Sequence, residues 1–296
     1  MKKHPKVSII TLVAQRPIEE IKKYLDSIGK ITYPNFELIL IINNEREKYA
    51  EDIIFLASHY PGIQIINNHR NLGFCAGANT GLKVALKNKS DFTLLLNDDV
   101  IVKRNIIEEL LLPFRTNKKI GLVSPLIMQY PDAQKIWYAG GYMSRFFAYS
   151  KTNKINKKLK KGIKSRPTDV ISGCCVMVKR KVWQKLGLLD EDLFMYFDDP
   201  DLSLRAWKKG FICFLVAKPL VIHLKKSAKL NSTEAYYYAR NPFILISKHY
   251  AGYKKITAYF GQFVIRLPRN IIRLQNQKAL RSYLKGIRDG TRGIRG

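Results

Sequence analysis

The sequence predicts an α/β fold with a Rossmann-like, mostly parallel central sheet, flanked by helices and followed by a basic helical tail. Apolar runs typical of buried strands alternate with segments whose apolar residues recur at helical spacing. This rhythm predicts parallel strands joined by right-handed crossovers. With 296 residues, 46% of them hydrophobic, the chain is long enough to bury a large core.

The elements are expected in the following order. In the first half, strands are predicted at residues 7–13, 36–42, 63–66 and 92–100, with helices after Pro17 and over 47–60, 82–88 and 106–114. In the second half, strands are predicted at 120–128, 169–178, 211–217 and 220–222, with helices at 182–188 and after Asp201. The Gly- and Asn-rich stretch 71–81 is expected to be a loop entering a helix, where free N–H groups can meet an anion or simply form a turn.

The charge of the chain points to a polyanionic partner. The 52 Lys and Arg against 23 Asp and Glu give a net charge of +29, which suits nucleic acid, an anionic membrane face or a phosphorylated substrate. Four cysteines without zinc-type spacing predict reduced thiols. No apolar stretch approaches the roughly 20 residues that span a bilayer, and the short apolar run at the N-terminus favours a strand over a signal peptide. We therefore expect a soluble or peripheral protein.

Two acidic clusters are the candidate chemical groups. Asn97, Asp98 and Asp99 follow a buried strand, where ligands of open α/β sheets bind; adjacent carboxylates there suit Mg²⁺ or Mn²⁺, although Asn and Asp also form plain turns. Asp198, Asp199 and Asp201 crowd before a helix beside three aromatic residues. One carboxylate would suffice to cap that helix, so this cluster favours a cleft. A lone His223 after a strand is more often structural than a ligand.

Two basic segments leave alternatives open. Residues 151–166 carry eight Lys or Arg and no acid, which is typical of a solvated loop or of a contact with a phosphate-bearing acceptor. The tail from residue 225 carries sixteen Lys or Arg against two acids, a net charge of +14. Its apolar stripe at helical spacing suits either an interfacial helix or a helix packed on the main domain.

Taken together, these motifs resemble glycosyltransferase family 2, and within it the rhamnosyltransferase-like branch. The matching stretches, from residue 5 to about 250, are VSIITLV, NLGFCAGANTG, LLLNDDV, SGCCVMVKR, GLLDEDLFMYFDDPDLSLRAWKKG, the isolated His223 and YYYARN. The resemblance implies a GT-A fold over residues 1–240, with a nucleotide-sugar half to about 115, an acceptor half to 240 and a basic helical extension over 241–296. It also implies inverting transfer of rhamnose or a similar hexose from a nucleotide diphosphate sugar.

The resemblance assigns roles to individual residues. Asp99 and His223 would hold Mg²⁺ or Mn²⁺, and Asp199 would be the general base, with Asp198 beside it. The acceptor would contact Gly173, Tyr196 and Trp137. The nucleotide sugar would contact Val13, Gln15, Arg16, Asn43, Asn71, Gly73, Phe74, Gly77, Asn79, Asn97, Asp98, Arg240 and Asn241. The chemistry agrees, since inversion needs a carboxylate at the acceptor hydroxyl and a stabilised diphosphate leaving group.

Some positions depart from the family pattern. Asn43 stands where an Asp is usual, Asn97 replaces a frequent acid, and the first strand ends in Ala14, Gln15 and Arg16. A catalytically degenerate transferase therefore remains an alternative.

The expected partners follow from the charge and the family. They are a dTDP- or UDP-linked sugar donor, a saccharide acceptor carried on a lipid diphosphate, and an anionic membrane surface. We expect a cytoplasmic enzyme of cell-surface polysaccharide synthesis, peripheral on the inner face of the membrane. A nucleic-acid-binding protein is the rival from another class, but no known nucleic-acid module is present. A nucleotidyltransferase lacks its Gly-rich, Lys-containing signature here.

Overall fold

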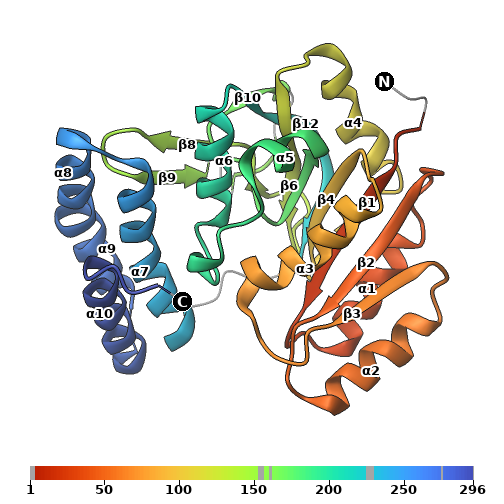
Figure 1. The fold of residues 1–296 in the computed structure, drawn as a ribbon, viewed down its shortest axis with the longest axis horizontal. Coiled ribbons are helices and arrows are strands. Elements are labelled where there is room, and N and C mark those ends of the chain that lie inside the picture. The colour runs from red at the N-terminus through yellow and green to blue at the C-terminus, as the bar shows by residue number, and fades with distance from the viewer. Residues whose placement is uncertain (1–3, 153–156, 160–161, 225–229, 275, 296) are drawn as a thin grey trace.

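The fold is described from a computed structural model that covers residues 4–152, 157–159, 162–224, 230–274 and 276–295. Strands and helices alternate in the first half (Figure 1): β1 (Val7–Val13), α1 (Ile18–Ile28), β2 (Phe36–Ile42), α2 (Glu47–Ser58), β3 (Ile63–Asn67), α3 (Gly73–Lys87), β4 (Phe92–Asn97), β5 (Val100–Val102) and α4 (Ile106–Thr116). This order confirms the predicted rhythm.

The second half adds strands to the same sheet and ends in helices. Its elements are β6 (Ile120–Gln129), β7 (Ile136–Tyr138), β8 (Gly141–Ser144), β9 (Tyr149–Thr152), β10 (Arg166–Thr168), β11 (Cys175–Lys179), α5 (Arg180–Leu186), the 3₁₀ turn η1 (Glu191–Leu193), α6 (Asp198–Lys208), β12 (Ile212–His223), α7 (Ser232–His249), α8 (Gly252–Phe260), the π-helix η2 (Gly261–Arg266), α9 (Leu267–Arg273) and α10 (Gln277–Thr291). The predicted strands 211–217 and 220–222 form one strand, β12, whose pairing with β6 shifts register between Val216 and Val221.

The central sheet has the strand order β10-β12-β6-β11-β4-β1-β2-β3, with β5 paired to β12 and β7 to β6. The pairs β3–β2, β2–β1, β1–β4 and β6–β12 are parallel, whereas β11 runs antiparallel between β4 and β6. Apolar strands fill both faces, as expected of a sheet covered by helices. The carboxyl ends of β1, β2 and β4 therefore meet at one edge, where ligands of such sheets bind.

The Gly- and Asn-rich stretch 71–81 is not a loop, because α3 already begins at Gly73. Its small residues allow the helix to lie close to the sheet: a Cβ at Gly77 would collide with Leu12, and one at Gly81 would come within 2.9 Å of Ile10 and 2.7 Å of Ile41. The prediction of a loop was wrong because glycine here serves close packing rather than chain reversal.

Helices α7 to α10 form a separate layer at the end of the molecule opposite α1 and α2 (Figure 1). α10 packs along α7, through contacts that include Ala235, Ala239, Ala279 and Tyr283. The predicted boundary between residues 240 and 241 lies inside α7, so the helical layer begins at Ser232. Part of the basic stretch 151–166 and the lysines at 225, 226 and 229 lie outside the described residues.

Candidate active site

The first acidic cluster lies where the sequence predicts, at the carboxyl end of β4. Asn97 is the last residue of that strand, and Asp98 and Asp99 form the turn that leads into β5. Val13 ends β1, the central neighbour of β4, and Asn43 follows β2. The parallel register thus gathers these predicted nucleotide-sugar residues at one edge of the sheet.

Strand β12 brings His223 to Asp99 across about 120 residues of sequence. His223 pairs with Val100 in the antiparallel β12–β5 ladder, and the Leu224 amide donates to the Asp99 carbonyl over 2.7 Å. His223 Nε2 lies 3.4 Å from Asp99 Oδ1, and both side chains are buried. The Trp137 ring packs against the imidazole at a tilt of 33°, with 4.4 Å between centroids.

Arg16 supplies a cation to this turn. Its Nη2 lies 2.9 Å from Asp99 Oδ2 and 3.2 Å from Asp98 Oδ1, and its Nε donates to Asp98 over 3.3 Å. The Tyr49 hydroxyl holds the Arg16 carbonyl. Burial raises the pKa of Asp98 to about 6, with the neighbouring Asp99 adding to the shift and Arg16 opposing it. The turn is therefore an environment that favours positive charge.

The donor set at Asp99 fits a divalent cation in chemistry and position. A carboxylate and an imidazole converge there, and a guanidinium already lies against the carboxylate. Within the described ranges, no three His, Cys, Asp or Glu side chains gather closely enough to hold a metal ion. Two protein ligands would leave the remaining coordination positions to water and substrate oxygens, as is usual for Mg²⁺.

The second acidic cluster begins α6, directly after a strained loop. Phe194, Tyr196 and Phe197 have φ angles of 56°, 66° and 67°, which are uncommon for bulky residues and cost free energy unless the surroundings enforce them. The Asn241 side-chain amide enforces them by donating to the carbonyls of Leu193, Met195 and Tyr196.

A second contact fixes the same loop from the donor half. The Phe194 carbonyl accepts from the amides of Phe74 and Cys75 at 2.6 and 3.2 Å. The N-terminus of α3, predicted as an anion site, is thus capped by protein. Gly73, with φ of +78°, is required there because a Cβ would lie 2.5 Å from the Phe194 ring.

The pKa values of the Asp198 and Asp199 carboxyls are both raised. Burial raises the pKa of Asp198 to about 6. Burial, followed by repulsion from Asp198, raises the pKa of Asp199 well above its ordinary value, although the Gly173 amide donates to it. At Asp201 burial acts the same way, but His249 and Arg205 outweigh it and lower the pKa. A carboxylate with a raised pKa is suited to accept a proton.

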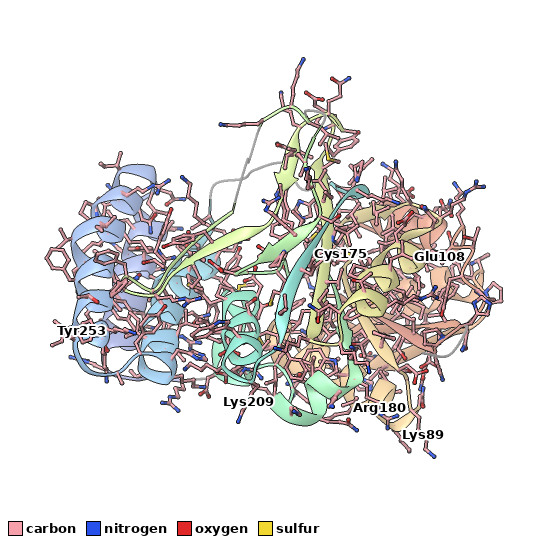
Figure 2. The ribbon with its side chains drawn as sticks, turned by 90° about the horizontal axis from the view of Figure 1, so that it is seen from above. Lys89, Glu108, Cys175, Arg180, Lys209 and Tyr253 are labelled. Carbon is pink, nitrogen blue, oxygen red and sulfur yellow. The ribbon has the colours of Figure 1, made fainter. Side chains whose placement is uncertain are left out.

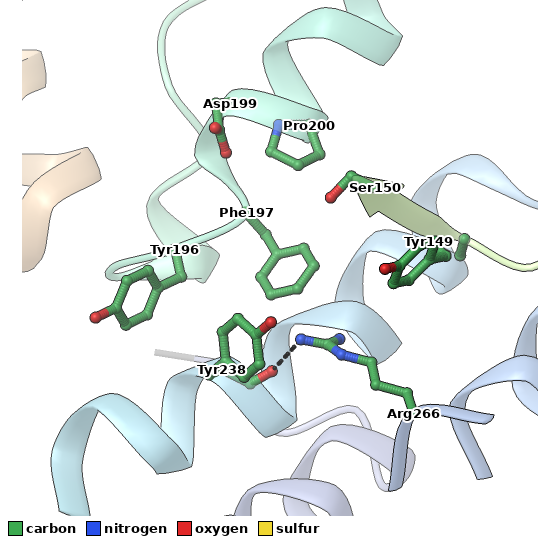
Figure 3. Close-up of a pocket in the computed structure, with 9 residues that line it drawn as sticks. Tyr149, Ser150, Tyr196, Phe197, Asp199, Pro200, Tyr238 and Arg266 are labelled. Atoms are coloured by element: carbon green, nitrogen blue, oxygen red, sulfur yellow. Dashed lines mark hydrogen bonds between the residues drawn. The ribbon is translucent and has the colours of Figure 1, made fainter. Parts of the chain in front are cut away.

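Asp199 lines two cavities. The first, about 70 Å³, also contains Trp137, Ser150 and Ser172. The second, about 140 Å³, contains Ser150, Tyr196 and Tyr238 (Figure 3). The predicted acceptor residues Trp137 and Tyr196 therefore lie in different cavities that share Asp199, and Trp137 connects the first of them to His223.

Three predicted nucleotide contacts lie inside the protein and hold its loops. Arg240 is fully buried, and its Nη2 donates to the Asp192 carbonyl over 2.6 Å. Asn241 binds the loop carbonyls described above. Asn79 binds the backbone of Leu189 through both its amide nitrogen and its oxygen. Each makes hydrogen bonds to backbone groups that burial would otherwise leave unsatisfied, and the contact of these residues with the nucleotide sugar stays a prediction.

Asn43 is also occupied by protein groups. Its amide nitrogen donates to Asn71 Oδ1 and the Gly73 carbonyl, and its oxygen accepts from Asn68 and the Leu72 amide. It orders the segment that follows β3. Gln15 and Asn71 are exposed, and Phe74 is partly exposed.

The site thus combines paired acids and a histidine at the carboxyl edge of the sheet with a second acidic pair at the start of α6, an arrangement that suits glycosyl transfer on a GT-A fold. The model of glycosyltransferase-like family 2 matches residues 5–239. The chain therefore belongs to that family, as the sequence motifs predict, and this favours the glycosyltransferase over the nucleic-acid-binding alternative.

Curated relatives are similar over most of their length. An N-acetylglucosaminyl-diphospho-decaprenol L-rhamnosyltransferase from Mycobacterium tuberculosis is 23% identical over 73% of this chain and 75% of its own. The dTDP-rhamnosyl transferase RfbF from Shigella flexneri is 22% identical over 79% of this chain and 80% of its own.

Solved structures share the fold. GalNAc-T7 with UDP, GalNAc and Mn²⁺ has a TM-score of 0.63 at 15% identity, over 92% of this chain and 59% of its own. The mannosyltransferase PcManGT from Pyrobaculum calidifontis, with GDP-Man and Mn²⁺, has a TM-score of 0.61 at 14% identity, over 97% of this chain and 76% of its own. Both confirm the predicted GT-A fold.

Proposed function

We propose that this glycosyltransferase moves rhamnose or a similar hexose, with inversion, from a dTDP- or UDP-linked donor to a hydroxyl of a saccharide carried on a lipid diphosphate. The two rhamnosyltransferase relatives support the sugar, and the mycobacterial relative supports the acceptor. The product would belong to cell-surface polysaccharide synthesis.

The observation that carries the proposal is the pair of acidic clusters joined through Trp137. The ring packs against His223 beside Asp99, and Asp199 also lines the cavity that the ring lines. A donor held at Asp99 would present its sugar carbon C1 toward this cavity. Asp199 would take the proton of the acceptor hydroxyl. At the same time, the oxygen of that hydroxyl would bond to C1 on the face opposite the diphosphate. The bond from C1 to the diphosphate breaks, and the nucleoside diphosphate leaves with the electron pair.

The leaving diphosphate needs positive charge. Mg²⁺ or Mn²⁺, when bound by Asp99 and His223, would neutralise charge on the diphosphate oxygens. Arg16 lies beside the same carboxylates and can donate to a phosphate from there. Asp98 would face the ribose or the diphosphate.

The helical layer supports attachment to an anionic membrane surface. From α8 through η2 to α9, polar side chains face the protein and apolar side chains face outward. Gln262, Arg266 and Asn270 are buried, whereas Ile256, Phe260 and Ile272 are 72%, 55% and 80% exposed. Tyr253 projects from the same end (Figure 2). An apolar outer face flanked by lysines and arginines is typical of interfacial helices. In the part of the chain that the structure describes, no helix is long and apolar enough to cross a membrane. The attachment that we propose is peripheral and to the cytoplasmic leaflet.

A transfer assay tests the proposed reaction. Purified protein is incubated with dTDP-rhamnose or UDP-hexoses, Mn²⁺ or Mg²⁺ and a lipid-diphosphate N-acetylglucosamine acceptor. We expect one donor to give a disaccharide whose NMR spectrum shows an inverted anomeric configuration. Retention of configuration would contradict the assigned role of Asp199, and no transfer from any donor would favour a degenerate transferase.

Vesicle flotation tests the membrane proposal. Wild-type protein should float with anionic vesicles at low salt, and the double variant Ile256→Ser with Phe260→Ser should float several-fold less. Phe55→Ser is the matched control, because Phe55 is 71% exposed but lies on α2, at the opposite end of the molecule. Equal flotation of the double variant and the wild type would contradict the assigned face.

A further inference from the structure

The cavity of about 140 Å³ beside Asp199 is built partly by the C-terminal helices. Asp199, Tyr196 and Phe197 come from the loop before α6 and its first turn, and Tyr149 and Ser150 come from β9. Tyr238 on α7 and Arg266 at the end of the π-helix complete it. Figure 3 shows Asp199 on one side of this space and Arg266 on another, with the Phe197 ring between them. The general base therefore shares a cavity with a cation from a distant segment.

Arg266 is a buried cation whose hydrogen-bond acceptors and ring contacts are all neutral. Its Nη1 donates to Gln262 Oε1 and its Nη2 to the Tyr238 carbonyl, both over 3.1 Å. Its guanidinium carbon lies 4.3 Å from the Tyr238 ring centroid and 4.8 Å from that of Phe197. Among the residues that the structure describes, no Asp or Glu makes an ion pair with it. The side chain is only 8% exposed.

A buried charge without a counter-ion is costly, and an anion from solution can supply the missing partner. The guanidinium has five N–H donors, so the two hydrogen bonds leave donors for a ligand. Its planar fork matches the oxygens of a phosphate. The π-helix that carries it is a form often found at functional sites.

We propose that this cavity is a subsite for the phosphate that adjoins the acceptor sugar, with Arg266 contacting the phosphate while the sugar hydroxyl lies at Asp199. The aromatic rings of Tyr196, Phe197 and Tyr238 supply apolar faces for the sugar between these two groups. This inference rests on the proposed glycosyl transfer. In this proposal the C-terminal helical layer takes part in acceptor recognition. Its inward face contacts the acceptor phosphate, and its outward face contacts the lipid surface.

Calorimetric titration tests the subsite. The protein is first saturated with whichever nucleoside diphosphate raises its melting temperature, so that the donor site is filled. The probes are N-acetylglucosamine 1-phosphate, its neutral methyl glycoside and methyl glucuronide. We expect the phosphorylated sugar to bind at least tenfold more tightly than the neutral one, since hydrogen bonds to charged groups are worth about tenfold to a hundredfold in affinity.

Arg266→Gln should remove this preference, and Arg266→Lys should retain part of it. Arg281→Gln is the charge-matched control, because Arg281 is exposed on α10 and does not line the cavity. Melting temperatures identify a variant that fails to fold, in which case Arg266→Lys carries the comparison. Equal binding or no binding of the phosphorylated and neutral sugars, tighter binding of the glucuronide, or an unchanged preference in a folded Arg266→Gln would overturn the proposal. Failure of the proposed function is seen separately, as no response to any nucleoside diphosphate.

Discussion

The two pairs of adjacent aspartates in this glycosyltransferase lie in opposite electrostatic surroundings. Asp98 and Asp99 face the Arg16 guanidinium, and His223 lies beside them. Across the described part of the chain, no Lys, Arg or His makes an ion pair with Asp198 or Asp199, and backbone amides such as that of Gly173 are their donors. Burial raises the pKa of Asp98 and of Asp198 alike, to about 6, but only the first pair lies beside cations, which compensate the carboxylates when a charged ligand binds. We therefore expect the same dipeptide to serve binding at one place and proton transfer at the other.

The largest expected effect comes from removing the proton acceptor. Asp199→Asn should lower the transfer rate by about 10³-fold, in the range typical of a general base, while leaving nucleotide binding unchanged. Asp198→Asn is the matched variant and should cost much less. A rate loss in Asp198→Asn that equals or exceeds the loss in Asp199→Asn would reverse the assignment between the two residues.

The second expected effect concerns stability and pH. Because the folded pKa of Asp198 is raised to about 6, its ionisation opposes folding: stability is present at low pH and is lost as the pH rises through that value. Asp198→Asn should therefore raise the free energy of unfolding by about 3 kcal/mol at pH 8, and the gain should vanish near pH 4. Urea unfolding at the two pH values measures it. If Asp198→Asn is less stable than the wild type at pH 8, the claim that the ionised Asp198 carboxylate destabilises the folded protein is wrong.

A smaller effect is expected at Arg16. Arg16→Gln removes the guanidinium from Asp98 and Asp99, so Mn²⁺ no longer competes with it for these carboxylates. If that competition costs about 1.4 kcal/mol, the nucleotide-free variant should bind Mn²⁺ about tenfold more tightly than the wild type. Binding is measured by the electron paramagnetic resonance signal of free Mn²⁺. Arg104→Gln, an exposed arginine, serves as control. Unchanged Mn²⁺ affinity would show that Arg16 does not compete at this turn.

Much of the donor half could be predicted from the sequence. The first two strands begin and end where the apolar runs do, and the run at 92–100 places Asp98 and Asp99 at the sheet edge because strand composition alone determines burial there. The antiparallel direction of β11 was not predictable, since its apolar residues suit either direction. The pairing of Arg16 with the aspartates depends on strand order, which periodicity does not encode.

The residues around the second cluster were harder to predict because their partners are distant in sequence. Arg240 and Asn241 bind carbonyls about 45 to 48 residues away, and nothing local distinguishes such a role from phosphate binding. Arg266 is not among the predicted site residues, because the apolar stripe dominates the pattern of the tail. The polar residues Gln262, Arg266 and Asn270 recur every four positions, and that stripe is the signal of an inward polar face.

The most direct measurement of the contrast between the two pairs is a thermal-shift panel of UDP, dTDP and GDP with Mn²⁺, Mg²⁺ or a chelator, on wild type, Asp99→Ala and Asp199→Asn. A ligand that binds only the folded state raises the melting temperature. We predict a metal-dependent shift with one nucleotide that is lost in Asp99→Ala and retained in Asp199→Asn. A shift that survives in Asp99→Ala, or one lost in both variants, would contradict the division of binding and proton transfer between the two aspartate pairs.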